Sequence, residues 1–306
     1  MTPLLAIKID IDTHEGMATG VPRLLEALAR ARLPATFFLA LGPDRSGLAA
    51  VQMARSPRFA LKMLSTRAGS LYGWRTALSG TLLPARRIAT AFPQLVVRME
   101  AEGHETAVHA WDHRNWQDNL LTFKRDRIRA HLSRAVAAYR QLTGHDPSGI
   151  GAPSWTTTPE SLALQEEFPF TYASDLRGGP PCRLRTTQGL LRLPQLPASG
   201  PCLEELLAQG IQGEEALAQA LVADLRAQRS RLRVLTVHAE VEGGPYLGTL
   251  ERVLHRLPEI GEVVTMQVAA QRLQNLPVRW WCRRRLPGRA FPVTTSRRER
   301  PTRDAS

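Results

Sequence analysis

Short apolar runs that end in polar residues alternate with helical patterns along most of this chain, and this alternation constrains the fold more than any other feature. Residues 4–12 and 35–42 are two such runs, and a helical pattern with proline in its first turn spans 21–31 between them. A strand, a helix and a second buried strand predict a β-α-β unit with parallel strands. Further strands are predicted over residues 104–109, 150–152, 170–175, 190–194, 233–238 and 263–266.

The predicted helices fill the spaces between these strands. So many strand–helix repeats favour a barrel over an open sheet. We therefore predict an α/β fold built as an irregular (β/α) barrel. The helices are expected over residues 96–103, 123–142, 159–167, 214–226 and 250–257.

Two segments do not fit the alternation. Residues at about 52–84 carry aromatic, aliphatic and basic side chains without a clean strand pattern, so we expect an insertion that lies over the domain. The residues from 276 to 306 are rich in arginine, and we expect this basic C-terminal tail to be flexible or to rest at a membrane interface.

The formal charge of +12 raises nucleic acid as a partner, because clustered basic residues supply the salt-dependent part of that affinity. Much of the excess lies in the tail, and the rest is scattered over helical faces, so no nucleic acid is expected. A solvated basic surface explains the charge, and attraction to an anionic membrane surface or a phosphorylated lipid is the alternative.

The sequence opposes both membrane insertion and export. No stretch approaches the ~18–20 uncharged apolar residues of a spanning helix, and the N-terminus lacks the features of a secretory signal. The three cysteines show no paired spacing, which indicates neither a disulfide framework nor a thiolate zinc site. We expect a cytoplasmic protein.

Polar residues recur where the predicted strands end, which is where a barrel places its reactive groups. His109 and His113 are four residues apart, and on a helical turn that spacing puts both imidazoles on one face. With Asp12 they make a set of two histidines and one carboxylate that leaves positions open for water and substrate. Zinc suits these ligands, and manganese or cobalt are alternatives; a chance pair of histidines is the other explanation.

Asp10 and His238 are candidates for acid–base catalysis. Asp10 shares a face of the first strand with Asp12, so it could take a proton from an attacking water while Asp12 binds the metal. His238 ends another strand and could donate a proton to a leaving amine. The structural alternatives are that the two acids cap the turn at Thr13, and that Glu240 or Glu242 ties the imidazole.

These residues, in this order, resemble the motifs of the polysaccharide deacetylase family, also called the NodB homology or carbohydrate esterase family four. The resemblance covers roughly residues 4–275 and implies a seven-stranded barrel, a catalytic domain over 1–275 and hydrolysis of an amide. It implies that Asp10 is the base, that His238 is the acid, and that Asp12, His109 and His113 bind the metal.

A narrower resemblance lies in Ser70–Trp74, in Tyr172–Asp175 with the following Leu-Arg-Gly, and in His238–Gly243. These segments are similar to the branch of the family that removes formate from a polyprenyl-phosphate-linked amino sugar at the inner face of the bacterial inner membrane. The sugar product modifies lipid A and confers polymyxin resistance. The substrate-binding candidates are Tyr72, Trp74, Trp111, Glu240 and Glu242.

One position departs from the family pattern. The family places an arginine near its third motif to position the catalytic aspartate, whereas Thr156 follows Trp155 here. Either another arginine, Arg177 being the candidate, supplies this contact, or the base is held differently. We expect Asp175, Arg177 and Trp155 to support the catalytic residues. The rival functions are deacetylation of another N-acyl amino sugar and lipid binding without catalysis.

Overall fold

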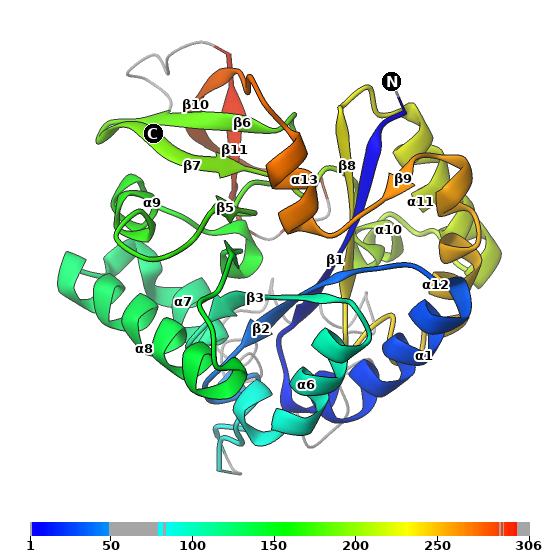
Figure 1. Ribbon diagram of the computed structural model, residues 1–306, viewed down its shortest axis with the longest axis horizontal. Helices are drawn as coiled ribbons and strands as arrows, with labels where there is room; N and C mark the ends of the chain where they lie inside the picture. Colours follow the sequence, from blue (N-terminus) through cyan, green and yellow to red (C-terminus); the bar gives the residue numbers. More distant parts are fainter. Residues whose placement is uncertain (1, 49–78, 82–83, 288, 290, 299–306) are drawn as a thin grey trace.

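The computed structural model describes residues 2–48, 79–81, 84–287, 289 and 291–298 (Figure 1). The insertion predicted at about 52–84 lies almost entirely outside these residues, as do Tyr72 and Trp74. No helix in the described ranges is both long enough and apolar enough to cross a membrane.

In the described part, seven parallel strands form the central sheet in the order β7-β5-β4-β3-β2-β1-β8. Helices surround this sheet (Figure 1), which confirms the predicted α/β fold of seven-stranded type. The path of described strands does not close into a ring. The strands are β1 (Leu4–Ile11), β2 (Thr36–Ala40), β3 (Glu105–Ala110), β4 (Gly149–Ile150), β5 (Tyr172–Ala173), β7 (Gly189–Gln195) and β8 (Leu232–His238), and β9 (Glu262–Val263) pairs with the start of β1.

The predicted helices are present, with ends that local signals explain. Proline stands in the first turn of α1 and of α6, and Gly144 ends α8 at a φ of 80° that favours glycine. The α-helices are α1 (Val21–Ala31), α6 (Pro93–Ala101), α7 (His113–Asn119), α8 (Arg125–Thr143), α9 (Pro159–Gln165), α10 (Leu203–Ala208), α11 (Glu214–Ala227), α12 (Leu247–Leu254) and α13 (Met266–Arg272). Shorter turns are η1 (Gly16–Gly20), η2 (Ala89–Ala91), η3 (Leu120–Thr122), η4 (Pro153–Trp155) and η5 (Leu257–Glu259).

The two faces of β1 have different surroundings. Its odd-numbered residues from Leu5 to Ile11 join the main core beneath the helices, whereas Ala6 belongs to a separate cluster inside the sheet. Because side chains alternate along a strand, Lys8 and Asp10 continue the inner face toward the carboxyl end of β1. The chain therefore places its charged strand residues inside the barrel.

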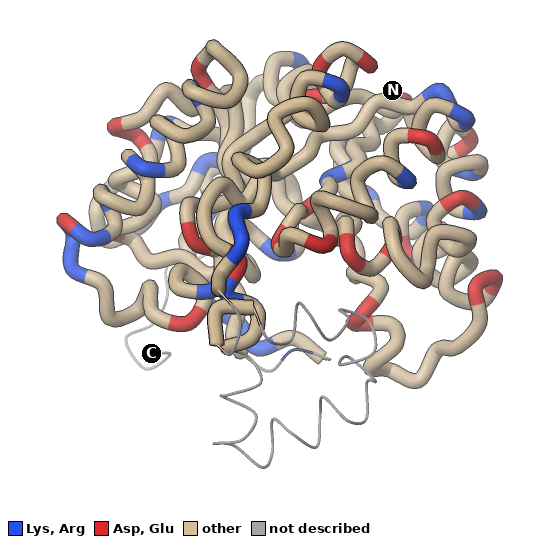
Figure 2. Tube along the Cα trace, turned by 90° about the horizontal axis from the view of Figure 1, so that it is seen from below, with Lys and Arg blue, Asp and Glu red and all other residues tan. Residues whose placement is uncertain are grey.

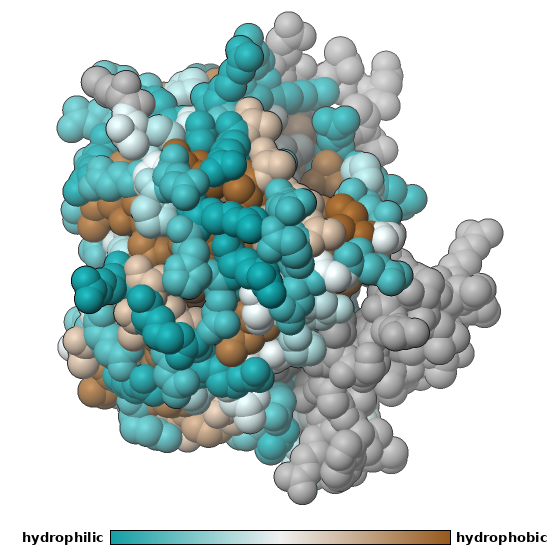
Figure 3. Space-filling view, turned by 90° about the vertical axis from the view of Figure 1, so that its right-hand side faces the viewer, coloured by the Kyte–Doolittle hydropathy of each residue, from teal (hydrophilic) through white to brown (hydrophobic). Residues whose placement is uncertain are grey.

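The outer surface is mixed in character. Figure 2 shows acidic and basic positions on the helices at both sides of the molecule. Figure 3, which looks onto the side that carries α1, α11 and α12, shows a largely hydrophilic surface with small hydrophobic patches between.

The C-terminal residues contradict the prediction of a flexible tail. Val278–Arg284 form β10 and Val293–Arg297 form β11, an antiparallel pair that we call the C-terminal hairpin. β10 also pairs with β6 (Cys182–Thr186), and β6 pairs with β7, so the hairpin extends the sheet. The run of arginines suggested disorder, but its tryptophans and branched residues suit a strand. The domain boundary near 275 stays a prediction.

Candidate metal centre and active site

Asp12, His109 and His113 come together at the carboxyl ends of β1 and β3. The Nε2 atom of His109 lies 3.2 Å from Asp12 Oδ1, and the Nε2 atom of His113 lies 3.2 Å from Asp12 Oδ2. One ligand atom from each residue can be chosen so that all lie within 4.8 Å of one another. These are the only three residues of the described chain that meet this test for a metal site.

The two histidines reach the centre from different elements, not from one helical turn as the spacing suggested. His109 ends β3, and His113 is the first residue of α7. Asp112 ends the turn between them, because its side chain accepts a hydrogen bond from the N–H of Asn115 at 3.0 Å and so caps α7. The end of β3 and the start of α7 together hold the centres of the His109 and His113 rings 5.1 Å apart.

The donor set fits a divalent cation such as zinc. Nδ1 of the buried His109 donates a hydrogen bond to the Gly151 carbonyl at 2.7 Å, which leaves Nε2 free as a ligand. Asp12 Oδ1 is buried without a hydrogen-bond partner among the described residues, as expected of an atom that needs a cation. Burial would raise the pKa of Asp12, but His113 and His109 outweigh it and hold the pKa well below the usual value.

Asp10 lies beside this centre and is paired with Lys8. Both side chains are almost fully buried, and Lys8 Nζ forms an ion pair with Asp10 Oδ1. The ammonium also lies 4.4 Å from the centre of the Phe38 ring. In the following turn, the N–H of His14 donates a hydrogen bond to Asp44, and the N–H of Gly16 donates one to the Thr13 hydroxyl. These two N–H groups are therefore not capped by Asp10 or Asp12.

His238 stands opposite Asp10 in the parallel pairing of β1 with β8. Its Nδ1 lies 3.0 Å from Oε1 of Glu204, in the first turn of α10. Burial alone would lower the pKa of His238, but the charge and hydrogen bond of Glu204, with the charges of Cys202 and Asp12, together raise that pKa well above the ordinary value. Burial would raise the pKa of Glu204, but the attraction of His238, a backbone hydrogen bond and Arg289 together lower it to about 2. The two groups thus favour a protonated imidazole beside an ionised carboxylate.

Arg177 does not supply the contact that Thr156 lacks. Its guanidinium pairs with Oε2 of Glu205 at 2.5 Å, and Arg289 of the C-terminal hairpin pairs with Oε1 of the same carboxylate at 2.6 Å. The interpretation that Arg177 replaces the family arginine at the base is therefore wrong. Lys8 is the residue that forms an ion pair with Asp10.

Trp155 lies between these arginines and the barrel interior. Arg289 lies 4.4 Å and Arg177 5.6 Å from the centre of its ring. The indole is buried, and its backbone, like that of Ser154, has a positive φ near 50°. Because positive φ is unfavourable for residues with a Cβ atom, the surrounding contacts must hold this turn.

The C-terminal hairpin supplies several of those contacts. Thr294 bonds to both the N–H (3.1 Å) and the hydroxyl (2.9 Å) of Thr157, and its carbonyl accepts from the N–H of Arg177 at 2.9 Å. Trp281 donates its indole N–H to the Thr157 hydroxyl at 3.1 Å. The hairpin therefore covers the turn that follows Trp155.

Asp175 supports the neighbouring loop. Its carboxylate accepts hydrogen bonds from the N–H of Ala152 at 2.8 Å and from the Gln195 amide at 3.2 Å. Complete burial raises its pKa to about 6. Since Gly151 holds His109, Asp175 fixes the residue next to a contact of the metal centre.

The predicted substrate-binding residues divide into three groups. Glu240 and Glu242 are buried near His238; the Glu242 carboxylate accepts the backbone N–H of His238 at 2.8 Å, so neither ties the imidazole as considered above. Burial, followed by the charge of Asp12, raises the pKa of Glu240, and burial raises that of Glu242 to about 8. Trp111 lines a separate cavity, and Tyr72 and Trp74 lie outside the described residues.

The sequence interpretation missed Lys8, Glu204 and Arg289. A lysine between isoleucines, two residues before Asp10 on a buried strand, is a signal that could have revealed Lys8. Glu204 stands in a helical first turn, where acids are common, so nothing distinguished it. Arg289 was one of many arginines in a segment predicted to be flexible.

Comparison with known proteins gives a consistent result. The model of the family described as Polysaccharide deacetylase matches residues 6–173. A probable 4-deoxy-4-formamido-L-arabinose-phosphoundecaprenol deformylase of Shewanella sediminis is 32% identical over 239 residues, 78% of this chain and 76% of that protein. The protein of the same description from Wigglesworthia glossinidia brevipalpis is 26% identical over 279 residues, 90% and 96% of the two chains.

The fold is shared with solved structures. A putative polysaccharide deacetylase from Mycobacterium smegmatis superposes with a TM-score of 0.60 at 21% identity, covering 88% of this chain and 89% of that one. The barrel with its helices is thus common to both chains.

Proposed function

Because this chain belongs to the polysaccharide deacetylase family of amide hydrolases, we propose that it removes the formyl group from a polyprenyl-phosphate-linked 4-formamido-arabinose. The observation that carries the proposal is the grouping of Asp12, His109 and His113 beside the facing Asp10 and His238. The relative that is 32% identical is described as a deformylase of a formamido sugar on phosphoundecaprenol. This description supports both the formamide group and the lipid phosphate of the proposed substrate.

We assign Asp12, His109 and His113 to a divalent cation, zinc before manganese or cobalt. Such a cation, when bound, polarises the amide carbonyl and makes water a stronger nucleophile near neutral pH. The three side chains keep one wall of the centre rigid, because β3 and the start of α7 fix both imidazoles. That rigidity favours the orientation that hydrolysis needs.

Asp10 acts as the general base in this proposal. Its carboxylate accepts a proton from the water that attacks the formamide carbon. Lys8 pairs with the Asp10 carboxylate and fixes it inside the barrel. The Lys8–Asp10 pair thus does what an arginine does elsewhere in the family.

His238 acts as the general acid. Its protonated imidazole donates a proton to the sugar nitrogen as the C–N bond breaks, so the products are formate and the free amine. Glu204 holds the ring by Nδ1 and stabilises its positive charge. Asp10 and His238 stand on neighbouring strands, which suits proton removal and proton delivery on two sides of one amide.

A polyprenyl substrate implies action at a membrane surface. We place the protein in the cytoplasm, peripheral to the inner face of the bacterial inner membrane, where the freed amino sugar would serve lipid A modification and polymyxin resistance. The net charge of +12 favours contact with anionic lipids.

Formate release from synthetic undecaprenyl-phosphate 4-formamido-arabinose tests the proposal. We expect release by the purified protein, loss of release with a chelator, and recovery when zinc, manganese or cobalt is added back. The acetamido analogue serves as the comparison and should react more slowly. Rapid release of acetate instead of formate would assign another N-acyl amino sugar, and no release with any metal from folded protein would leave lipid binding as the function.

Glu204→Gln is expected to move the alkaline limb of the pH–rate profile to lower pH. Glu204 raises the pKa of His238, and the protonated imidazole is the acid, so activity is present below this raised pKa and is lost as pH rises through it. Without the Glu204 carboxylate, the His238 imidazole loses its proton at a lower pH, and the rate at alkaline pH should fall about 10-fold or more. Measurement of kcat/KM from pH 5 to 10 checks this.

Glu205→Gln is the matched control, because Glu205 is the next residue of α10 and pairs with two arginines instead of His238. Its alkaline limb should stay in place even if the protein loses stability. If the alkaline limb falls at the same pH in Glu204→Gln and in the unmodified protein, Glu204 does not raise the pKa of the catalytic acid.

A further inference from the structure

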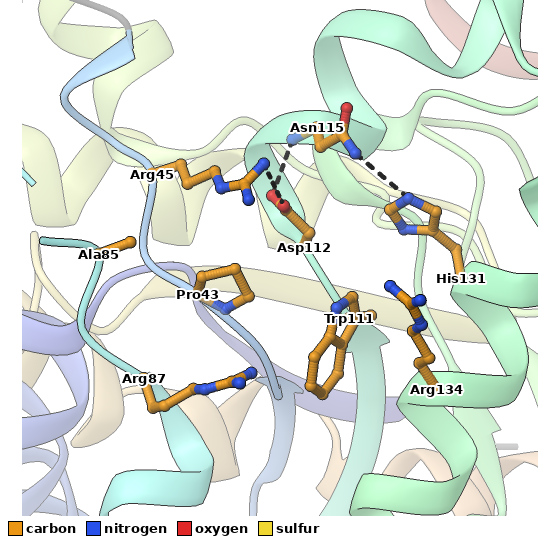
Figure 4. A pocket seen from close by; sticks show the side chains of 9 residues that line it. All are labelled: Pro43, Arg45, Ala85, Arg87, Trp111, Asp112, Asn115, His131 and Arg134. Carbon is orange, nitrogen blue, oxygen red and sulfur yellow. Dashed lines mark hydrogen bonds and ion pairs between the residues drawn. The ribbon is translucent and has the colours of Figure 1, made fainter. Parts of the chain in front are cut away.

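A cavity of about 340 Å³, separate from the metal centre, opens between the carboxyl ends of β2 and β3 and the helix α8 (Figure 4). Arg45 reaches it from the turn after β2, and Arg134 reaches it from α8. Trp111 stands between the side chains of Arg87 and Arg134 in this view. We call these four residues and the space they enclose the arginine pocket. Its volume suits a small ligand group.

The arginine pocket has an excess of positive charge. Its lining contains three arginines and one acid, Asp112, which gives a formal charge of 3 − 1 = +2. Arg45 Nη1 lies 3.2 Å from Asp112, so one positive charge is matched. Neither Arg87 nor Arg134 forms an ion pair with any carboxylate of the described chain, and these two charges remain available to an anion.

The segment that follows Arg45 offers no further acid to neutralise the pocket. From Arg45 to Met99 the chain has nine lysines and arginines and no aspartate or glutamate. Residues 49–78 and 82–83, which belong to this stretch, therefore contribute no carboxylate side chain. Burial, together with nearby arginines, lowers the pKa of His131 in the pocket wall, so this ring is neutral and leaves the arginines as the charged groups.

The groups in the pocket suit phosphate in particular. The Arg87 guanidinium lies 5.0 Å from the centre of the Trp111 ring, a contact that orients its planar fork. Guanidinium groups bind phosphate oxygens through paired hydrogen bonds, and the aromatic wall can contact a sugar ring. Simple solvation explains one exposed arginine but does not explain why Arg87 and Arg134 flank one cavity without acidic partners.

The pocket shares a loop with the metal ligands. Trp111 is two residues from His109 and two from His113, so its Cα atom lies within about 7.6 Å of each of theirs along the chain. The pocket wall and the metal ligands are therefore neighbours in the chain, so one sugar-phosphate could place its formamide at the metal centre and its phosphate in the pocket.

We propose that the arginine pocket binds the phosphate group of the substrate, with Arg87 and Arg134 as its principal cationic contacts. The inference rests on the proposed function for the identity of the ligand, a sugar-linked polyprenyl phosphate. Arg45 adds a third positive charge at the rim and keeps Asp112, the cap of α7, from facing the anion.

The test compares two substrates in the metal-loaded, full-length protein. The double variant Arg87→Gln/Arg134→Gln should raise KM for the polyprenyl-phosphate-linked sugar about 10- to 100-fold, because charged hydrogen bonds to phosphate are lost. Its kcat/KM for the methyl glycoside of the same 4-formamido sugar, which has no phosphate, should stay unchanged. Arg140→Gln, on the same helix but paired with Asp146, is the matched control and should alter neither.

An equal effect on both substrates, or no effect on either, overturns the phosphate site. If the unmodified protein hydrolyses neither substrate, the proposed function fails while the pocket is still tested by calorimetric binding of geranyl phosphate and of inorganic phosphate. At least 10-fold weaker binding of geranyl phosphate to the double variant supports the pocket, and equal binding rejects it. Equal loss for inorganic phosphate identifies the phosphate itself as the recognised group, and a loss confined to geranyl phosphate identifies the lipid-linked form.

Discussion

Asp10→Asn is expected to lower kcat for formate release about 10²- to 10⁴-fold while the protein keeps its metal. Asparagine has nearly the same shape as aspartate but cannot accept the proton of the attacking water. Asp10 is not among the grouped ligands Asp12, His109 and His113, so metal content, measured by atomic emission, should not change. The steady-state rate and the metal content together separate the base from the ligands.

His113→Ala provides the opposite control. It removes one of the three ligand atoms, so metal content should fall and activity should fall with it. Turnover of Asp10→Asn at the unmodified rate would refute the assignment of the base, and full metal content in His113→Ala would refute the assignment of the ligands.

Lys8→Met is expected to lower the free energy of unfolding by about 3–5 kcal/mol, because it leaves Asp10 as a buried charge without its partner. Methionine retains much of the volume of the side chain, so the loss reports mainly the charge. Urea denaturation followed by circular dichroism gives the change. The double variant Lys8→Met/Asp10→Asn should recover most of this stability, since neither charge is then left alone.

A catalytic consequence accompanies the loss of stability. Lys8 fixes the carboxylate of Asp10 in place, so Lys8→Met should also lower kcat for formate release. Lys8→Arg keeps a cation beside Asp10 and should retain most of the rate. If Lys8→Met leaves both the stability and kcat unchanged, Lys8 is not the residue that replaces the family arginine.

The parts of the site that lie on strand ends were predictable from the sequence. Alternation along β1 places Asp10 beside Asp12, and β3 and β8 deliver His109 and His238 to the same end of the sheet. The reason given for His113 was wrong, since the two imidazoles belong to a strand and a helix and not to one helical turn. The two residues still lie close together, because the short spacing limits their separation in either conformation.

Contacts between distant segments were not predictable. Arg289 meets Trp155 across 134 positions of sequence (289 − 155), and no local pattern signals such a contact. Glu204 is one of two adjacent acids in α10, and only the structure shows that one faces His238 while the other faces Arg177. The tail was misjudged because its charge was given more weight than its tryptophans and branched residues.

The C-terminal hairpin also bears on how the protein is made. Synthesis proceeds from the N-terminus, so a growing chain contains β1 to β4, and with them Asp10 and the three metal ligands, long before residues 278–297 exist. Until those residues emerge, the turn at Trp155 lacks Thr294 above it, and Glu205 lacks Arg289. The contacts that complete the catalytic end of the barrel therefore become available only after β10 and β11 have been synthesised.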